Sequence, residues 1–185
     1  MRERIPFGYI FAVGLAVGIL IMIFGRSSLP GDTGLWGTAV IEQIAAASAA
    51  GGALFVYLFI RRGGRFLLQS LAATTYLGIA AAVVAALWYG LAGGIFIMSA
   101  VLSYGMKGIM LVLGGTLPQY LIYAPMEYGL LRWSETTCRA IYKTKTPVLA
   151  ERVLKWLMLL AALIAGCVLE SFVNPPLIRG VVKLL

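Results

Sequence analysis

Three ionisable residues lie within or beside long apolar stretches of this sequence: Lys107, Glu127 and Glu170. A charged side chain in hydrocarbon is costly, so by default such a residue suggests a functional site. Glu127 could pair with Lys107 or with Arg132. A transporter would use such carboxylates for proton coupling, whereas a scaffold would use them to fix helix packing, and the sequence leaves both interpretations open. For Lys107 the simpler interpretation is an ammonium group that snorkels to the membrane surface.

Several residue types on which membrane enzymes depend are absent from the sequence. It contains no histidine, which excludes histidine general bases, Ser-His dyads and zinc-dependent intramembrane proteases. Asp32 is the only aspartate, and no glycine-rich segment has the spacing of a phosphate-binding loop. Cys138 and Cys167 are far apart and form neither a disulfide framework nor a metal pattern. We therefore expect no enzyme activity, no catalytic residue, no cofactor and no metal site.

The composition is typical of an integral membrane protein. Of 185 residues, 61% are hydrophobic and 12% are charged, whereas an ordinary soluble domain is about a quarter charged. The apolar runs are continuous and rich in Ala, Leu and Gly, which predicts an all-α fold with one polytopic transmembrane bundle over residues 1–185. The net charge of +8 indicates cytoplasmic loops rather than nucleic-acid binding, because Lys and Arg concentrate on the cytoplasmic side of membrane proteins.

Hydropathy predicts five transmembrane helices and a short amphipathic C-terminal helix on the membrane surface. The expected spans are at about 7–24, 40–60, 66–89, 95–113 and 156–173, and the amphipathic tail is at 174–185. The basic segments at 61–65 and 132–155 are expected to be cytoplasmic loops. With five crossings the positive-inside rule places the N-terminus in the cytoplasm and the C-terminus outside.

The stretch at 116–133 is unusually polar for the middle of an apolar region. It carries two prolines, a glutamine, tyrosine hydroxyls and a carboxylate, and each needs a partner or water in hydrocarbon. We expect a broken or re-entrant helix here, which is tolerated only where protein or water satisfies the freed backbone groups.

Two small-residue patterns predict close helix contacts. Gly14 and Gly18 are four residues apart in the first expected span, and Ser48 and Gly52 have the same spacing in the second. Such surfaces pack helices within one chain, in a homo-oligomer, or against the membrane anchor of another protein. If they hold partners, bulky substitutions there abolish partner capture and leave membrane insertion intact.

Two stretches resemble the stage II sporulation protein M family. The segment from Leu117 to Pro125, which begins Leu-Pro-Gln, resembles that family's Leu-Pro-(Gln or His)…Pro segment. The residues Glu170-Ser171-Phe172-Val173-Asn174-Pro175 are similar to its closing Glu-x-(aromatic)-x-x-Pro motif. The resemblance marks these residues as structural or partner-binding: Leu117, Pro118, Gln119, Pro125, Glu127, Glu170 and Pro175.

The resemblance implies a non-enzymatic plasma-membrane scaffold of endospore formation, on the mother-cell side of the sporulation septum. It implies recruitment of two membrane-anchored peptidoglycan hydrolases, an amidase/endopeptidase and a lytic transglycosylase, for septum dissolution and forespore engulfment. The alternative function is a small transporter or permease subunit whose site is the broken Pro118–Pro125 helix with Lys107 and Glu127.

Overall fold

The computed structural model describes residues 4–25, 51–142 and 149–173, and in those ranges the chain is helical with short turns and no strand. This confirms the all-α class predicted from the apolar runs. The described helices are α1 (Phe7–Gly25), α3 (Gly51–Ala73), α4 (Gly78–Tyr104), α5 (Met106–Tyr142) and α6 (Leu149–Phe172).

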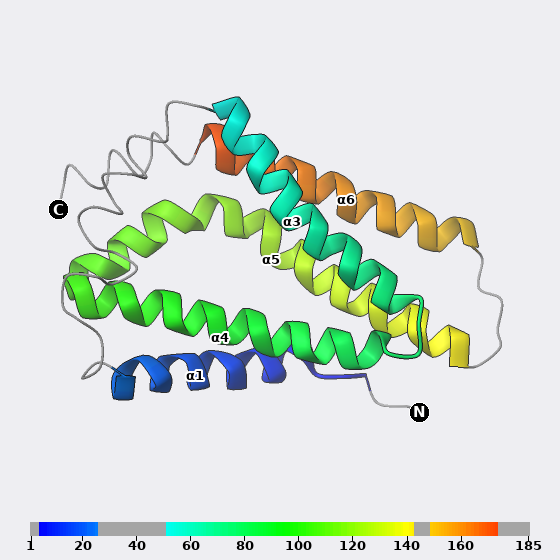
Figure 1. Ribbon diagram of the computed structural model, residues 1–185, viewed down its shortest axis with the longest axis horizontal. Coiled ribbons are helices and arrows are strands. Elements are labelled where there is room, and N and C mark those ends of the chain that lie inside the picture. The colour runs from blue at the N-terminus through cyan, green and yellow to red at the C-terminus, as the bar shows by residue number, and fades with distance from the viewer. Residues whose placement is uncertain (1–3, 26–50, 143–148, 174–185) are drawn as a thin grey trace.

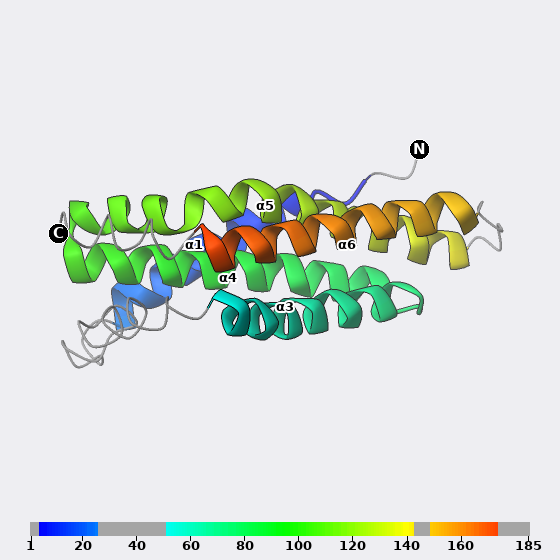
Figure 2. The same cartoon turned by 90° about the horizontal axis from the view of Figure 1, so that it is seen from above.

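The helices lie roughly along one axis and alternate in direction. Figure 1 shows α1, α4 and α6 running one way and α3 and α5 the other. Helix α1 packs against α4, α5 contacts both α4 and α6, and α3 contacts α4, α5 and α6. Viewed from above, the same helices remain aligned along the long axis (Figure 2).

Three of the described helices are long and apolar enough to cross a membrane: α1, α4 and α6. A hydrocarbon core of about 30 Å needs roughly 20 residues of helix. The candidate spans of α4 and α6 have 27 and 23 residues, and that of α1 has 19. Helix α1 covers the expected span at 7–24, and α6 begins earlier than the expected span at 156–173.

The middle of the chain differs from the expected spans at 66–89 and 95–113. A turn at Thr74–Leu77 ends α3, and Gly105, with a φ of 59°, ends α4. The hydroxyls of Thr74 and Thr75 donate to the backbone oxygens of Leu71 and Ala72 at 2.7 Å each. These carbonyls also accept the backbone N–H groups of Thr74 and Thr75, so both are doubly satisfied where α3 ends, before the turn that precedes Gly78.

The basic segment at 61–65 is not a loop, which corrects the expected cytoplasmic boundary there. It lies in the interior of α3. The helix continues because its arginines find partners: Arg62 binds Glu170, and Arg61 donates to the hydroxyl of Tyr57 at 2.8 Å. Of the expected span at 40–60, residues 40–50 lie outside the described ranges, and so does Ser48.

The expected break at 116–133 is also wrong, because α5 is one helix of 37 residues that continues through both prolines. It bends part-way along its length (Figure 1), as expected where proline removes a backbone donor and clashes with the preceding turn. At 1.5 Å per residue the helix is about 55 Å long, which exceeds the thickness of the hydrocarbon core.

The closest helix contact joins α1 and α4 through glycines on both sides. A Cβ atom on Gly14 or Gly18 would overlap the backbone oxygen of Leu87 or Leu91, and a Cβ atom on Gly90 or Gly94 would overlap the backbone of α1. The small face of α1 is therefore already occupied by α4. Gly52 differs, since it is exposed and a Cβ atom there would meet nothing within 4 Å.

Candidate functional site

A half-buried ion pair joins α3 to α6 in the upper layer of Figure 1. Nη2 of Arg62 donates to Oε1 of Glu170 at 2.8 Å, and the two side chains are only 22% and 14% exposed. An ion pair this shielded from solvent costs desolvation energy and is strongly destabilised when one partner is removed. Its position therefore holds the two helices in a single register.

Tyr123 brings a third helix, α5, into the same cluster. Its hydroxyl donates to Oε2 of Glu170 at 3.0 Å and lies 3.4 Å from Sγ of Cys167. Its ring faces the guanidinium of Arg62, with 4.1 Å between Cζ and the ring centroid. The two carboxylate oxygens of Glu170 thus have separate donors, and the cation stacks on an aromatic face.

The cluster of Arg62, Tyr123, Cys167 and Glu170, which we call the three-helix cluster, sits beside apolar packing. Tyr123 and Cys167 belong to a buried apolar core with Phe66, Met126, Leu130 and Leu163. The Tyr123 ring lies directly over Gly166, where a Cβ atom would overlap it. Apolar surroundings strengthen the hydrogen bonds and make an unpaired member costly.

Glu127, on α5, belongs to a second polar group and not to the pairs expected from the sequence. It interacts with the hydroxyl of Tyr89 of α4 and electrostatically with Arg65 and Arg62 of α3. Lys107 lies about 30 Å away along α5. Arg132 instead donates to the hydroxyl of Tyr128 and to Glu135. Neither expected partner therefore pairs with Glu127.

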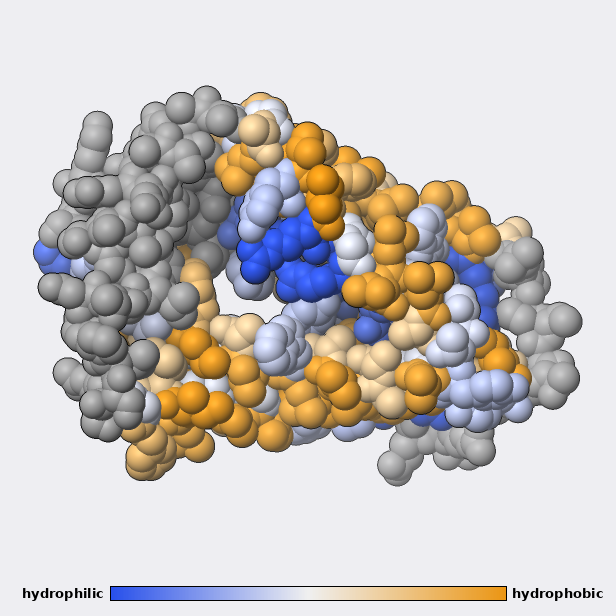
Figure 3. All heavy atoms as spheres, in the orientation of Figure 1, coloured by the Kyte–Doolittle hydropathy of each residue, from blue (hydrophilic) through white to orange (hydrophobic). Residues whose placement is uncertain are grey.

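Hydrophilic residues gather in a hollow of the molecular surface where α3 crosses α5, beside an opening above α4 (Figure 3). The described basic residues of α3, Arg61, Arg62 and Arg65, lie in the middle of that helix. Arg61 and Arg65 are exposed, whereas Arg62 is partly buried. Among the described residues, this hollow is the largest hydrophilic area of the surface seen in that view.

The remaining motif residues are distributed along α5 and beyond. Gln119 is buried, and Pro125 is exposed toward a groove between α5 and α6. Leu117 and Pro118 lie on α5 in a stretch whose side chains are not described, and Pro175 lies outside the described ranges. The structure thus brings Tyr123 of the central stretch to Glu170 of the closing motif.

Arg62 is a site residue that the sequence analysis did not predict. It stands in a run of three arginines and two glycines between apolar segments, a pattern typical of a cytoplasmic loop. The one available signal was Glu170, since a carboxylate in an apolar helix requires a cation or a donor.

A second ionic cluster lies at the opposite end of the bundle, outside the candidate spans. Glu135 of α5 accepts hydrogen bonds from the backbone N–H of Ile5 at 3.3 Å and from Arg132 at 2.8 Å, and forms an ion pair with Arg139 at 2.8 Å. Burial alone would raise the pKa of the Glu135 carboxyl, but these three donors together hold that pKa below its ordinary value. The cluster fastens Ile5, just before α1, to α5.

The depressed pKa of Glu135 predicts an acid-sensitive contribution to stability. The ionised form stabilises the fold above the unfolded pKa of about 4.3, and this stabilisation is lost as the pH falls through the lower folded pKa. We expect Glu135→Gln to lower the free energy of unfolding at pH 7 by about 2 kcal/mol, since a hydrogen bond to a charged group contributes about 1.5–3 kcal/mol. The difference should shrink between pH 5 and pH 3 in detergent unfolding curves. A difference that is constant with pH would contradict the prediction.

In the described residues no group of three His, Cys, Asp or Glu side chains could hold a metal ion. The three-helix cluster offers one carboxylate, one guanidinium, one phenol and one thiol, all engaged with one another. Its chemistry suits the fixing of helix positions. Comparison with protein-family models, with curated proteins and with solved structures finds no match to this chain.

Proposed function

We propose that this chain is a membrane scaffold of the stage II sporulation protein M type, which recruits peptidoglycan hydrolases to the sporulation septum for engulfment. The observation that supports this most is the contact between Tyr123 and Glu170. Tyr123 lies in the first stretch that carries the family resemblance and Glu170 in the second, so two residues far apart in the sequence meet in one cluster. Motif residues that fix helix positions are what a non-enzymatic scaffold needs.

The partners in this proposal are the single-span anchors of an amidase/endopeptidase and a lytic transglycosylase. The face of α1 that carries Gly14 and Gly18 is filled by α4, so the anchors bind elsewhere. Apolar side chains on the outer side of α1, such as Val13, Val17 and Leu20, are 41–58% exposed. Such surfaces can pack against another helix in the membrane without a catalytic residue.

We infer five crossings from the directions of the helices. Helices α1, α4 and α6 run the same way (Figure 1), so if each crosses the membrane the chain must return twice between them. Helices α3 and α5 are the described segments that lie between them in the chain and run back. The end where α5 stops and α6 begins carries Arg132, Arg139, Arg152 and Lys155. By the positive-inside rule that end is cytoplasmic, which puts the N-terminus inside.

Cysteine labelling tests this arrangement. Thr75, in the turn between α3 and α4, and Lys107, at the start of α5, are both exposed. We expect Thr75→Cys to react with a membrane-impermeant maleimide only after cell permeabilisation, and Lys107→Cys to react in intact cells. The native cysteines, Cys138 and Cys167, are buried, so the unsubstituted protein is the blank. Labelling of both positions from one side would contradict five crossings.

Deletion of the gene in its native host tests the function. We expect membrane-dye imaging of sporulating cells to show septa that form but are not dissolved, and forespores that are not wrapped. Complementation with the wild-type gene should restore engulfment, and tagged protein should co-purify both hydrolases. Normal engulfment in the deletion strain would overturn the scaffold proposal.

A second candidate function is a small transporter, favoured by the polar group of Glu127, Tyr89 and Arg65, which joins α5 to α4 and α3. A carboxylate held at such a place can exchange a proton with a bound solute. This candidate requires substrate flux in proteoliposomes that is lost in Glu127→Gln. Unchanged flux in that variant would exclude a role of Glu127.

A further inference from the structure

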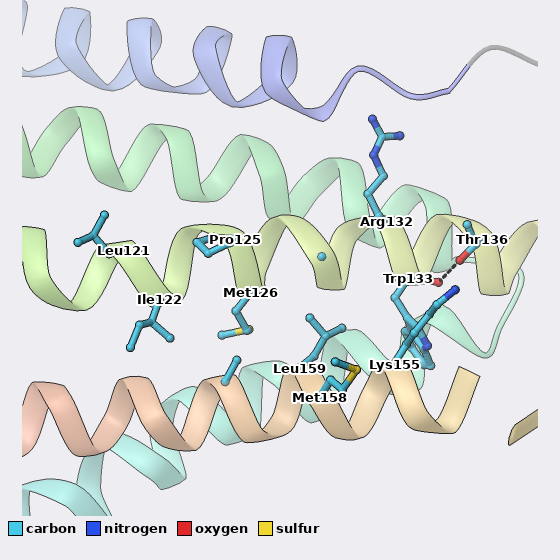
Figure 4. Close-up of a pocket in the computed structure, with 12 residues that line it drawn as sticks. Leu121, Ile122, Pro125, Met126, Arg132, Trp133, Thr136, Lys155, Met158 and Leu159 are labelled. Carbon is cyan, nitrogen blue, oxygen red and sulfur yellow. Dashed lines mark hydrogen bonds between the residues drawn. The ribbon is translucent and has the colours of Figure 1, made fainter. Parts of the chain in front are cut away.

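An open apolar groove of about 670 Å³ runs between α5 and α6 (Figure 4). Its apolar walls include Leu121, Ile122 and Met126 of α5 and Met158, Leu159 and Ala162 of α6. Two small residues, Gly129 of α5 and Ala162 of α6, also line it, and the side chain of Leu159 packs against Gly129. Helix α6 is a candidate membrane span, and where it crosses a membrane the open side of the groove would face lipid.

The groove becomes polar at the end where α5 stops and α6 begins. Trp133, Thr136 and Lys155 line it there, and Lys155 extends from α6 toward α5 in Figure 4. The indole N–H of Trp133 donates to the backbone oxygen of Arg152 at 3.2 Å, which fixes the ring at the mouth. Trp is the residue that favours the boundary between headgroups and acyl chains.

The charge at this mouth is positive. Arg132, Arg139, Arg152 and Lys155 are the basic side chains of the described residues there. Arg132 points away from α6 (Figure 4), so Lys155 is the cation that faces the groove. Its partner is Glu151 at 3.3 Å, but both side chains are more than 60% exposed, and an exposed pair of this kind contributes little and is easily exchanged.

We propose that the groove binds one anionic glycerophospholipid, with an acyl chain along the apolar walls and its phosphate at Lys155. Charge complementarity supports an anionic headgroup, because basic pockets between membrane helices on the cytoplasmic side bind such headgroups. The position of Lys155, near the start of the α6 span, matches the depth of a headgroup when the acyl chain lies against Ala162.

The size of the groove favours an acyl chain over a helix. A crossing helix about 10 Å wide and 30 Å long occupies roughly 2,400 Å³, several times the volume of the groove. A partner's anchor would rest on the rim and leave the space between the two helices unfilled. A flexible acyl chain can follow the floor between the two helices.

Native mass spectrometry of the purified full-length protein in detergent tests the proposal. The probes are dioleoyl-phosphatidylglycerol and dioleoyl-phosphatidylcholine, which share acyl chains and differ in headgroup charge. We expect one phosphatidylglycerol to be retained more tightly than phosphatidylcholine. Lys155→Gln should weaken the binding of phosphatidylglycerol about fivefold, which is the effect of one basic residue at an anionic surface. The same variant should leave the binding of phosphatidylcholine unchanged.

Two further variants make the result decisive. Ala162→Phe fills the groove and should reduce retention of both lipids, whereas Lys107→Gln, which removes a lysine near the other end of α5, should change neither. Lys155 is exposed, so its variant keeps the fold, which the unfolding midpoint checks. Equal retention of the two lipids by the wild type, or retention unaffected by Lys155→Gln and Ala162→Phe, overturns the proposal and favours a protein anchor on the rim.

Discussion

Gly90→Leu is expected to separate α1 from α4 and to lower the free energy of unfolding by about 3 kcal/mol or more. A Cβ atom at Gly90 would overlap the backbone oxygen of Phe11. Overpacking of a tight interior typically costs about 1–3 kcal/mol, and occasionally more. The cost is at the upper end here because the obstacle is helix backbone, which cannot rotate away as a side chain can. Unfolding in detergent, followed by circular dichroism, measures the loss.

Gly93→Leu is the matched control, since it makes the same substitution one turn of helix away. A Cβ atom at Gly93 would meet nothing within 4 Å, and leucine is a better helix former than glycine. We expect the stability of this variant to equal or exceed that of the wild type. If Gly90→Leu and Gly93→Leu unfold at the same midpoint, α1 does not lie against α4 in the described register.

This contact shows which part of helix packing can be predicted from the sequence. The spacing of Gly14 and Gly18 marks a small face, and the uncharged run at 7–24 gives the helix that carries it. The sequence does not say what covers that face. Gly90 and Gly94 have the same spacing, but the apolar run around them offers no end signal, so they fall between the expected spans at 66–89 and 95–113 although they lie in the middle of α4.

The same limit explains the missing half of the candidate site. Glu170 and the stretch around Tyr123 stand out because polar groups in apolar helices need partners. Arg62 does not stand out, because hydropathy places a run of arginines in a loop, and only tertiary pairing with Glu170 allows it inside α3. The turn at 74–77 is hard to predict for a related reason, since it lies in an apolar run where a single glycine, Gly78, follows it and two threonine hydroxyls bond to the last carbonyls of α3.

Glu170→Gln is expected to lower the free energy of unfolding by about 3 kcal/mol. The amide keeps the shape of the side chain and can still accept from Tyr123, but it removes the negative charge that pairs with Arg62 at 2.8 Å. Breaking a buried pair by removing one partner typically costs about 3–5 kcal/mol. Glu151→Gln is the control, because it breaks an exposed pair with Lys155 and should cost less than about 1 kcal/mol.

The double variant Arg62→Met/Glu170→Gln distinguishes the cost of an orphaned charge from the value of the pair. Met restores an apolar side chain of similar length, so the double variant should recover most of the stability lost in Glu170→Gln, with a coupling energy of about 2 kcal/mol in a double-mutant cycle. A Glu170→Gln variant that is no less stable than Glu151→Gln would mean that water solvates Arg62, whose side chain is 22% exposed, once its pair with Glu170 is broken.

The double variant also bears on function. A scaffold needs Arg62 and Glu170 only to hold α3 and α6 in register, so a stable double variant should still support engulfment and hydrolase capture. A chain that uses the Glu170 carboxylate itself, for proton coupling or for a direct polar contact with a partner, loses activity in the double variant although it folds. If the double variant recovers both stability and engulfment, the three-helix cluster has a structural role. If it recovers stability alone, the Glu170 carboxylate takes part directly in proton coupling or partner binding.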